Sequence, residues 1–259
     1  MQRQQKHKDF KSKAKQLLSL TCILCLSFVF SSSNAIRVKT ITFTAADGLE
    51  VTADEYLLDA EKPYILLFHE QGSSRGEFKE IARRFCKLEY NCLAVDLRNG
   101  GNNNFVSNQT ARQLREEGLL AGIREIEQDV EAAIKYAHEK SNHPVILFGS
   151  GANGSLSLKI AVSNKQVRAV VAMSPGEYFL PGLKIQDTIA FLKKPVFITS
   201  SKAELPYVSE LASGIGKDYL TLFEPKAGSG ERGTASLSEK YEQSTEYWIA
   251  LILFFKELM

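Results

Sequence analysis

Short apolar runs alternate with longer amphipathic segments along most of the chain. Runs rich in β-branched and aromatic residues, typical of buried strands, occupy residues 63–69, 91–96, 145–148, 167–173, 195–199 and 219–223. Apolar residues at helical spacing predict helices over residues 77–88, 123–140, 155 onward, 185–192, 207–215 and 237–259. Residues 105–121 show neither pattern. Buried strands that alternate with helices predict an α/β fold, with a mostly parallel sheet covered by helices on both faces.

The chain before the first buried run has a different pattern. Polar and apolar residues alternate over residues 36–44 and again over 49–58, and Asp47-Gly48 lies between the two segments. Alternation with a turn dipeptide predicts an antiparallel hairpin. No linker, repeat or low-complexity tract interrupts residues 36–259, so we expect this segment to be a single domain.

Residues 1–35 have the composition of a secretory leader. Basic residues crowd the first 15 positions, an apolar run of 14 residues follows at 17–30, and Ser31 to Ala35 supplies small residues. This order predicts a signal peptide that is cleaved after Ala35, and a secreted or periplasmic protein. The apolar run is short beside the ~20 residues of a bilayer span. An uncleaved N-terminal anchor is the alternative, and it is the only membrane contact we expect.

Charge and cysteine content exclude several classes of function. The whole chain carries a net charge of +2, but residues 1–35 hold six basic residues and one acidic residue. The remaining 26 basic and 29 acidic residues give a net charge near −3, so no nucleic-acid partner is expected. Cys86 and Cys92 remain after the leader, and either a disulfide or two buried free thiols is open. No His/Cys metal spacing follows the leader, so we expect neither a metal nor a cofactor.

Residues 144–161 combine a strand, a glycine-rich turn and a helix. This is the context of a nucleophile elbow, whose turn has the pattern G-x-S-x-G. With Gly149 as the first glycine, Gly151 occupies the position of the nucleophilic serine and Asn153 that of the second glycine. Glycine tolerates the strained backbone of such a turn but supplies no attacking atom.

The order of elements and three motifs resemble the α/β-hydrolase superfamily, in its dienelactone hydrolase-like branch. The motifs are Leu66-Leu-Phe-His-Glu-Gln-Gly72, Leu93-Ala-Val-Asp-Leu-Arg98 and Leu147-Phe-Gly-Ser-Gly-Ala-Asn-Gly154. The resemblance covers nearly all of residues 36–259. It implies an α/β-hydrolase fold and, in an active member, ester hydrolysis by a triad in the chain order Ser, Asp or Glu, His.

The triad positions that the resemblance assigns are all occupied by other residues. They are Gly151 for the nucleophile, Ala203 for the acid after the strand at 195–199, and Arg232 for the histidine after the last strand. Arginine stays protonated and cannot act as a general base. All four histidines precede the elbow, so none can fill the late triad position in any register. The candidate substitutes are Ser150, which we expect to pack below the turn, Glu204, which is otherwise an exposed loop residue, and His69, which is otherwise a loop anchor.

Three hypotheses for function remain open. The resemblance places two oxyanion-hole N–H groups at Gln71 (or Glu70) and Ala152, so the site could bind an unknown small molecule, an anion among the candidates with Arg232 nearby. The first hypothesis is therefore a pseudoenzyme that binds a ligand or a protein. The second is an active hydrolase of the esterase or dienelactone hydrolase type that uses displaced residues, such as Ser150 with His69. The third is a partner-binding module that uses the polar loop at 99–108 and the residues around Phe179.

Overall fold

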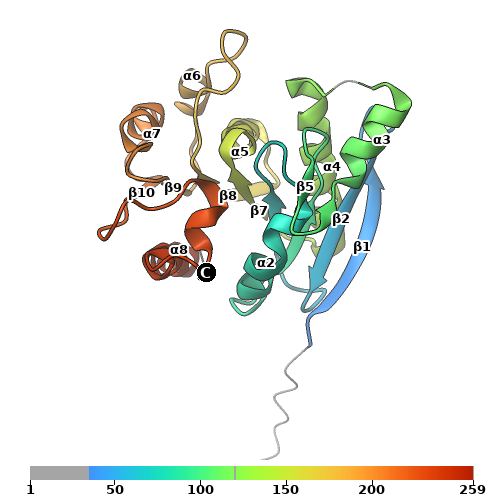
Figure 1. Cartoon of the computed structure of the whole chain (residues 1–259), viewed down its shortest axis with the longest axis horizontal. Coiled ribbons are helices and arrows are strands. Elements are labelled where there is room, and N and C mark those ends of the chain that lie inside the picture. Colours follow the sequence, from blue (N-terminus) through green and yellow to red (C-terminus); the bar gives the residue numbers. More distant parts are fainter. Residues whose placement is uncertain (1–34, 120, 259) are drawn as a thin grey trace, which may run out of the picture. The chain divides into compact units, whose positions relative to one another are not determined.

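An eight-stranded sheet forms the centre of the computed structural model, which describes residues 35–119 and 121–258 (Figure 1). Its strands lie in the order β1-β2-β4-β3-β7-β8-β9-β10. The strands are β1 (Arg37–Thr44), β2 (Glu50–Leu57), β3 (Tyr64–Phe68), β4 (Asn91–Val95), β7 (Val145–Ser150), β8 (Val167–Met173), β9 (Val196–Thr199) and β10 (Leu220–Phe223). A second, two-stranded sheet pairs β5 (Asn102–Asn103) with β6 (Val106–Ser107).

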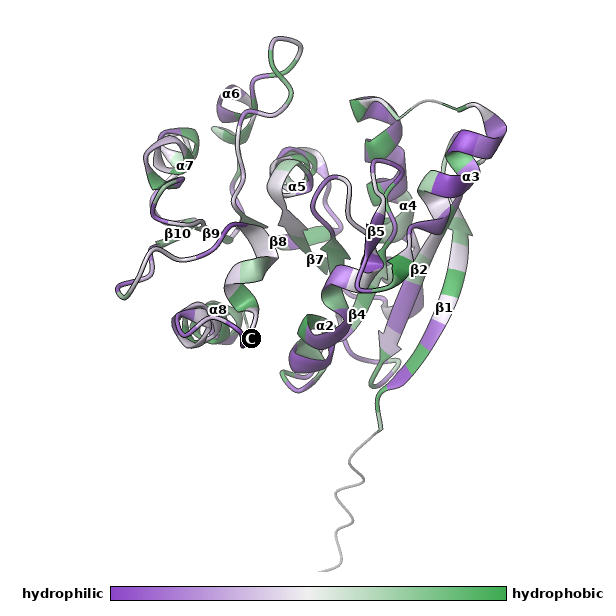
Figure 2. Cartoon of the chain, in the orientation of Figure 1, coloured by the Kyte–Doolittle hydropathy of each residue, from purple (hydrophilic) through white to green (hydrophobic). Residues whose placement is uncertain are grey.

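The direction of the strands confirms the predicted sheet. β2 pairs antiparallel with both β1 and β4, whereas the neighbours from β4 to β10 are parallel. The central strands β3, β4 and β7 are buried along their whole length, which explains their continuous apolar sequences. β1 lies at the edge of the sheet and alternates hydrophilic and hydrophobic residues (Figure 2).

Helices cover both faces of the sheet (Figure 1). The bounds are α2 (Lys79–Cys86), α3 (Gln109–Glu117), α4 (Ile123–Ser141), α5 (Gly151–Ser163), α6 (Ile185–Ile189), α7 (Leu205–Ala212) and α8 (Ser244–Glu257), with 3-10 turns η1 (Arg75–Phe78) and η2 (Gly233–Leu237). Apolar side chains of α4, α5, α6 and α7 form one core cluster with the sheet, and those of α2 and α8 form the other. The chain therefore has the three-layer arrangement that the sequence predicts.

Several predicted boundaries were wrong. The helix after the elbow begins at Gly151 and not at Ser155, because the strand continues through Ser150. The closing helix begins at Ser244, since the segment before it forms η2 and a turn instead. The unassigned segment 105–121 contains β6 and α3, which begins after Asn108, whose side chain accepts from the Ala111 N–H group.

The chain divides into two units near the end of the predicted leader. Contacts divide the chain into residues 1–35 and 36–259, and the predicted signal peptide lies outside the described residues. Among the helices that the structure describes, none has both the length and the apolar character needed to cross a membrane. Cys86 and Cys92 are both buried as free thiols, so the structure has the second of the two arrangements that the sequence left open.

Candidate active site

The elbow joins β7 to α5 at the carboxyl edge of the sheet. β7 ends at Ser150, and Gly151 begins the helix with φ of +55°. Residues other than glycine adopt this left-handed backbone only with strain. Gly149 allows a close approach of helix and strand, because a Cβ there would lie 2.5 Å from the Asn153 carbonyl oxygen. The turn thus keeps the shape of a nucleophile elbow with glycine at its centre.

The side chain of Glu70 occupies the space above Gly151. A Cβ on Gly151 would overlap the Cδ, Oε1 and Oε2 atoms of Glu70. Glu70 follows β3, the neighbour of β7 in the sheet, so both residues lie at the same edge. A carboxylate therefore fills the volume that a side chain at position 151 would need. The sequence places Glu70 near the elbow but contains no signal for the direction of its side chain.

Arg232 lies between two carboxylates. Its Nη1 donates to Glu204 Oε1 over 2.5 Å, and its Nη2 donates to Glu70 Oε1 over 3.2 Å and to the Tyr178 hydroxyl over 2.8 Å. Burial alone would lower the pKa of Arg232, but the hydrogen bond with Tyr178 and the charges of Glu70 and Glu204 outweigh it and raise this pKa. Burial raises the pKa of Tyr178, and the hydrogen bond from Arg232 opposes that rise. The guanidinium is held in its charged form.

Glu204, and not Ala203, is the acid of this arrangement. Ala203 is exposed, whereas Glu204 is buried and accepts from Ser174 Oγ and Ser201 Oγ, each over 2.8 Å. The view of Glu204 as an exposed loop residue was wrong, whereas the assignment of the family's acid position to Ala203 by loop length stays a prediction. Ser174 Oγ also accepts from the N–H group of Gly233, which follows Arg232. The result is a continuous ion-paired series, Glu70–Arg232–Glu204, which lies among the positions that the resemblance assigns to the triad.

The other two substitutes do not form a nucleophile and base pair with each other. Ser150 does not pack below the turn: its Oγ donates to Glu70 Oε2 over 3.1 Å. The buried His69 ring accepts from the Leu97 N–H group at Nε2 and contacts the Glu70 carbonyl oxygen through Nδ1. With Nε2 as an acceptor, Nδ1 carries the proton and donates to that carbonyl. His69 is thus a loop anchor with both ring nitrogens engaged.

The predicted oxyanion donors lie on either side of Glu70. The Ala152 N–H group belongs to the first turn of α5, where the helix itself supplies no acceptor. Gln71 is exposed, and the N–H group of its neighbour Glu70 donates to Glu77 Oε2 over 3.0 Å. Arg232 points at carboxylates and not at these donors, so its charge is already compensated. This geometry does not favour an anionic ligand.

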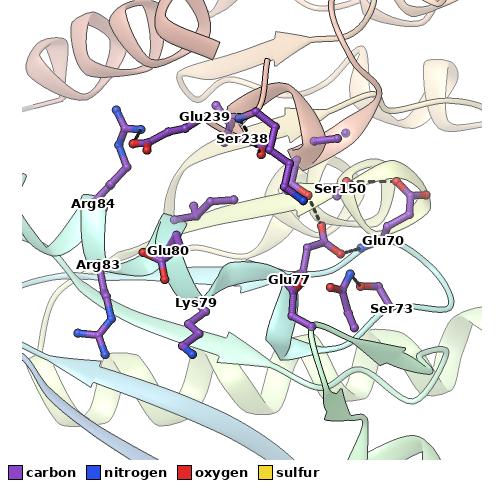
Figure 3. A pocket seen from close by; sticks show the side chains of 18 of the residues that line it. Glu70, Ser73, Glu77, Lys79, Glu80, Arg83, Arg84, Ser150, Ser238 and Glu239 are labelled. Atoms are coloured by element: carbon purple, nitrogen blue, oxygen red, sulfur yellow. Dashed lines mark hydrogen bonds and ion pairs between the residues drawn. The ribbon is translucent and has the colours of Figure 1, made fainter. Parts of the chain in front are cut away.

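A groove of about 1240 Å³ extends from this site along α2. Ser150 and Glu70 lie at one end, and the ion pair of Arg84 with Glu239 lies at the other (Figure 3). Within residues 35–119 and 121–258, no group of three or more His, Cys, Asp or Glu residues is arranged to hold a metal ion.

One family model matches more than half of the chain. The model of a family described as "Dienelactone hydrolase family" matches residues 53–212. None of the curated proteins compared with the chain matches it.

Solved structures of low sequence identity share the fold. A dienelactone hydrolase from Anabaena variabilis is 15% identical over 86% of this chain and 98% of its own, with a TM-score of 0.64. A Pyrococcus furiosus esterase is 17% identical over 86% and 92%, with a TM-score of 0.63. A dienelactone hydrolase-like promiscuous phosphotriesterase from metagenomic libraries is 16% identical over 86% and 99%, also with a TM-score of 0.63.

Proposed function

The chain belongs to the dienelactone hydrolase family, and we propose that it is an exported member without hydrolase activity, which binds a ligand or partner in its groove. One observation carries the proposal: the Glu70 carboxylate lies where the side chain of a nucleophile at position 151 would be. Glu70, Arg232 and Glu204 then form an ion-paired chain in place of a nucleophile, a base and an acid.

The ion-paired series Glu70–Arg232–Glu204 lacks the nucleophile and the base that acyl transfer needs. Gly151 has no atom that can attack an ester carbon, and Arg232 cannot accept a proton from a nucleophile. The Glu70 carboxylate is tied to Arg232 and to Ser150 Oγ. Loss of a catalytic triad lowers the rate by orders of magnitude, and the residual rate comes from binding and the oxyanion hole alone.

An active hydrolase is the second candidate, because Ser150 Oγ and Glu70 Oε2 lie within hydrogen-bond reach of each other. Glu70 would replace His69 as the base in this version. Access to the hydroxyl argues against it. Ser150 is only 1% exposed, and a Cβ on Gly233 would lie 2.5 Å from its Oγ. Gly233 therefore lies close to the hydroxyl, and the residue as a whole is almost fully buried.

Export is part of the proposal and rests on the leader alone. In a bacterial host, the released protein should begin at Ile36, which N-terminal sequencing or intact mass would show. A full-length chain retained with the membrane fraction would favour an anchor instead.

Hydrolysis of short-chain aryl esters over a range of pH tests the main proposal. The purified protein should show no turnover above background while its circular dichroism remains that of a folded α/β protein. Turnover that Ser150→Ala abolishes would overturn the proposal and make Ser150 the nucleophile.

A restored variant tests the reason for the loss. It should combine Glu70→Gly, Gly151→Ser and Arg232→His and keep Glu204 as the acid. We expect this triple variant to gain measurable turnover, whereas Gly151→Ser with Arg232→His should remain silent, because Glu70 still fills the site. Equal turnover by the triple and double variants would contradict the role given to Glu70.

A further inference from the structure

A fully exposed aromatic side chain stands at the tip of the β5–β6 hairpin. Phe105 has a relative exposure of 111%, and it lines the groove. Its φ is +62°, and that of Asn104 before it is +48°. A bulky residue in the left-handed region is a backbone outlier that costs free energy. An apolar ring that gains no burial does not offset this cost.

The hairpin is fixed to its surroundings in this conformation. Asn103 Nδ2 donates to Ser73 Oγ over 2.7 Å, and Asn104 Nδ2 donates to the Gly76 carbonyl oxygen over 2.9 Å. Ser74 Oγ donates to the Val106 carbonyl oxygen over 2.8 Å. The framework therefore holds Phe105 in place. The two-residue loop of a tight hairpin accounts for positive φ at both positions, so the unusual feature is an exposed phenylalanine where asparagine or glycine is preferred.

The neighbours of Phe105 are polar. Asn102, Asn104 and Gln71, which also line the groove, are exposed amides. An anchor residue in a protein interface lies in a desolvated, largely apolar centre. A single aromatic ring among amide groups does not provide such a centre, so the surface does not favour a protein partner.

The charges that face the groove near the site are compensated. Arg232 pairs with Glu70 at 3.2 Å and also with Glu204. Glu77 accepts from the Glu70 N–H group and from the Thr234 hydroxyl. Lys79 and Arg83 point away from Ser150 and Glu70 (Figure 3). At the end of the groove that holds Ser150, the charged groups Glu70, Glu77 and Arg232 thus all have partners, and the wall presents hydrogen-bonding groups beside them.

We propose that the groove binds a neutral oligosaccharide and that Phe105 stacks on one of its sugar rings. A pyranose ring has a face of C–H groups, which packs on an aromatic ring, and a rim of hydroxyls, which donate and accept. Amides and hydroxyls match that rim because they too offer both donors and acceptors. The inference deepens the proposed function and rests on it for the groove as the binding site.

Calorimetric titration of the purified protein tests the proposal, with cellohexaose, maltohexaose and chitohexaose as neutral probes and hexagalacturonate as the acidic probe. At least one neutral probe should bind with saturation. Phe105→Ala should weaken that binding about tenfold, the size expected for loss of one aromatic contact. Phe105→Tyr should restore it. Phe191→Ala is the matched control, because Phe191 is 73% exposed and does not line the groove.

Phe105→Gly separates binding from folding. Glycine accepts the positive φ, so this variant should raise the midpoint of urea unfolding while it weakens sugar binding. The proposal is overturned if no neutral probe binds, if only the acidic probe binds, or if Phe105→Ala and Phe191→Ala bind as the wild type does. The ester assay reports separately, since turnover abolished by Ser150→Ala would remove the pseudoenzyme proposal whatever the titrations show.

Discussion

The protein contains two ion-paired series, each with a guanidinium between two carboxylates, and the two series differ in burial. Arg98 joins Asp47 to Asp129, and its side chain is 0% exposed. Arg232 joins Glu70 to Glu204, and its side chain is 47% exposed. The first fastens the turn after β1 to α4, and the second crosses the carboxyl ends of the strands at the elbow. The same chemistry thus serves two purposes: a buried charge must be matched for the fold to form, whereas an exposed one can change without loss of the fold.

The largest expected effect is the difference between these two arginines. Arg98→Met should lower the free energy of unfolding by about 3–5 kcal/mol, because Asp129 is then left buried without the guanidinium that pairs with it. Arg232→Met should cost about 1–2 kcal/mol, since water can solvate the partly exposed Glu70, and the buried Glu204 keeps its hydrogen bonds from Ser174 Oγ and Ser201 Oγ. Urea unfolding at pH 7 measures both. Equal losses of unfolding free energy in the two variants would mean that burial does not distinguish the two ion-paired series.

Gly151→Ser tests whether Glu70, in the exposed series, occupies the volume that a nucleophile side chain at position 151 would need. The variant should lose about 2 kcal/mol more than Gly118→Ser, because overlap with Glu70 adds to the cost of the positive φ. Gly118 is the matched control: its φ is +66°, and a Cβ there would meet nothing within 4 Å. Adding Glu70→Gly to Gly151→Ser should recover most of the excess loss. Identical losses at positions 118 and 151 would show that Glu70 moves aside freely.

The smallest expected effect is the pH dependence of the stability that Asp47 contributes through the buried series. The hydrogen bond from Arg98 holds the pKa of Asp47 below its usual 3.8, although burial opposes this. A lowered pKa gives stability that is present above the usual pKa and is lost as pH falls through the folded-state value. Asp47→Asn should therefore cost about 1 kcal/mol at pH 7 and flatten the loss of stability below about pH 4. Unfolding curves between pH 2 and 7 provide the check. If stability falls below about pH 4 as steeply in Asp47→Asn as in the wild type, other carboxyl groups cause the loss of stability in acid.

Much of the fold could be predicted from sequence, because buried parallel strands have continuous apolar sequences. The prediction for β8, at residues 167–173, matches the structure at both ends. The start of α8 was missed because the apolar residues of the turn before it, such as Leu237, also pack into the core. Periodicity alone does not separate a helix from a buried turn.

The site was less predictable, since it depends on side-chain directions. Position 151 follows from the spacing of the glycines, which is local. The choice between Ala203 and Glu204 depends on which one faces Arg232 across a loop, and adjacent residues in a turn point in different directions. To predict that Glu70 lies above Gly151, one must know that β3 and β7 are adjacent and which rotamer Glu70 adopts. Local sequence patterns indicate neither.

The contact between Glu70 and Gly151 also constrains the order in which substitutions could accumulate. While Glu70 lies over the elbow, the Cβ of a serine at position 151 would overlap its carboxylate, so this substitution alone should cost stability. A change at Glu70 alone leaves Arg232 with one carboxylate fewer and still no nucleophile. Each single step back is neutral or harmful, and only the combination is useful. On the proposed function, a carboxylate that fills this site would therefore make a loss of catalysis difficult to reverse.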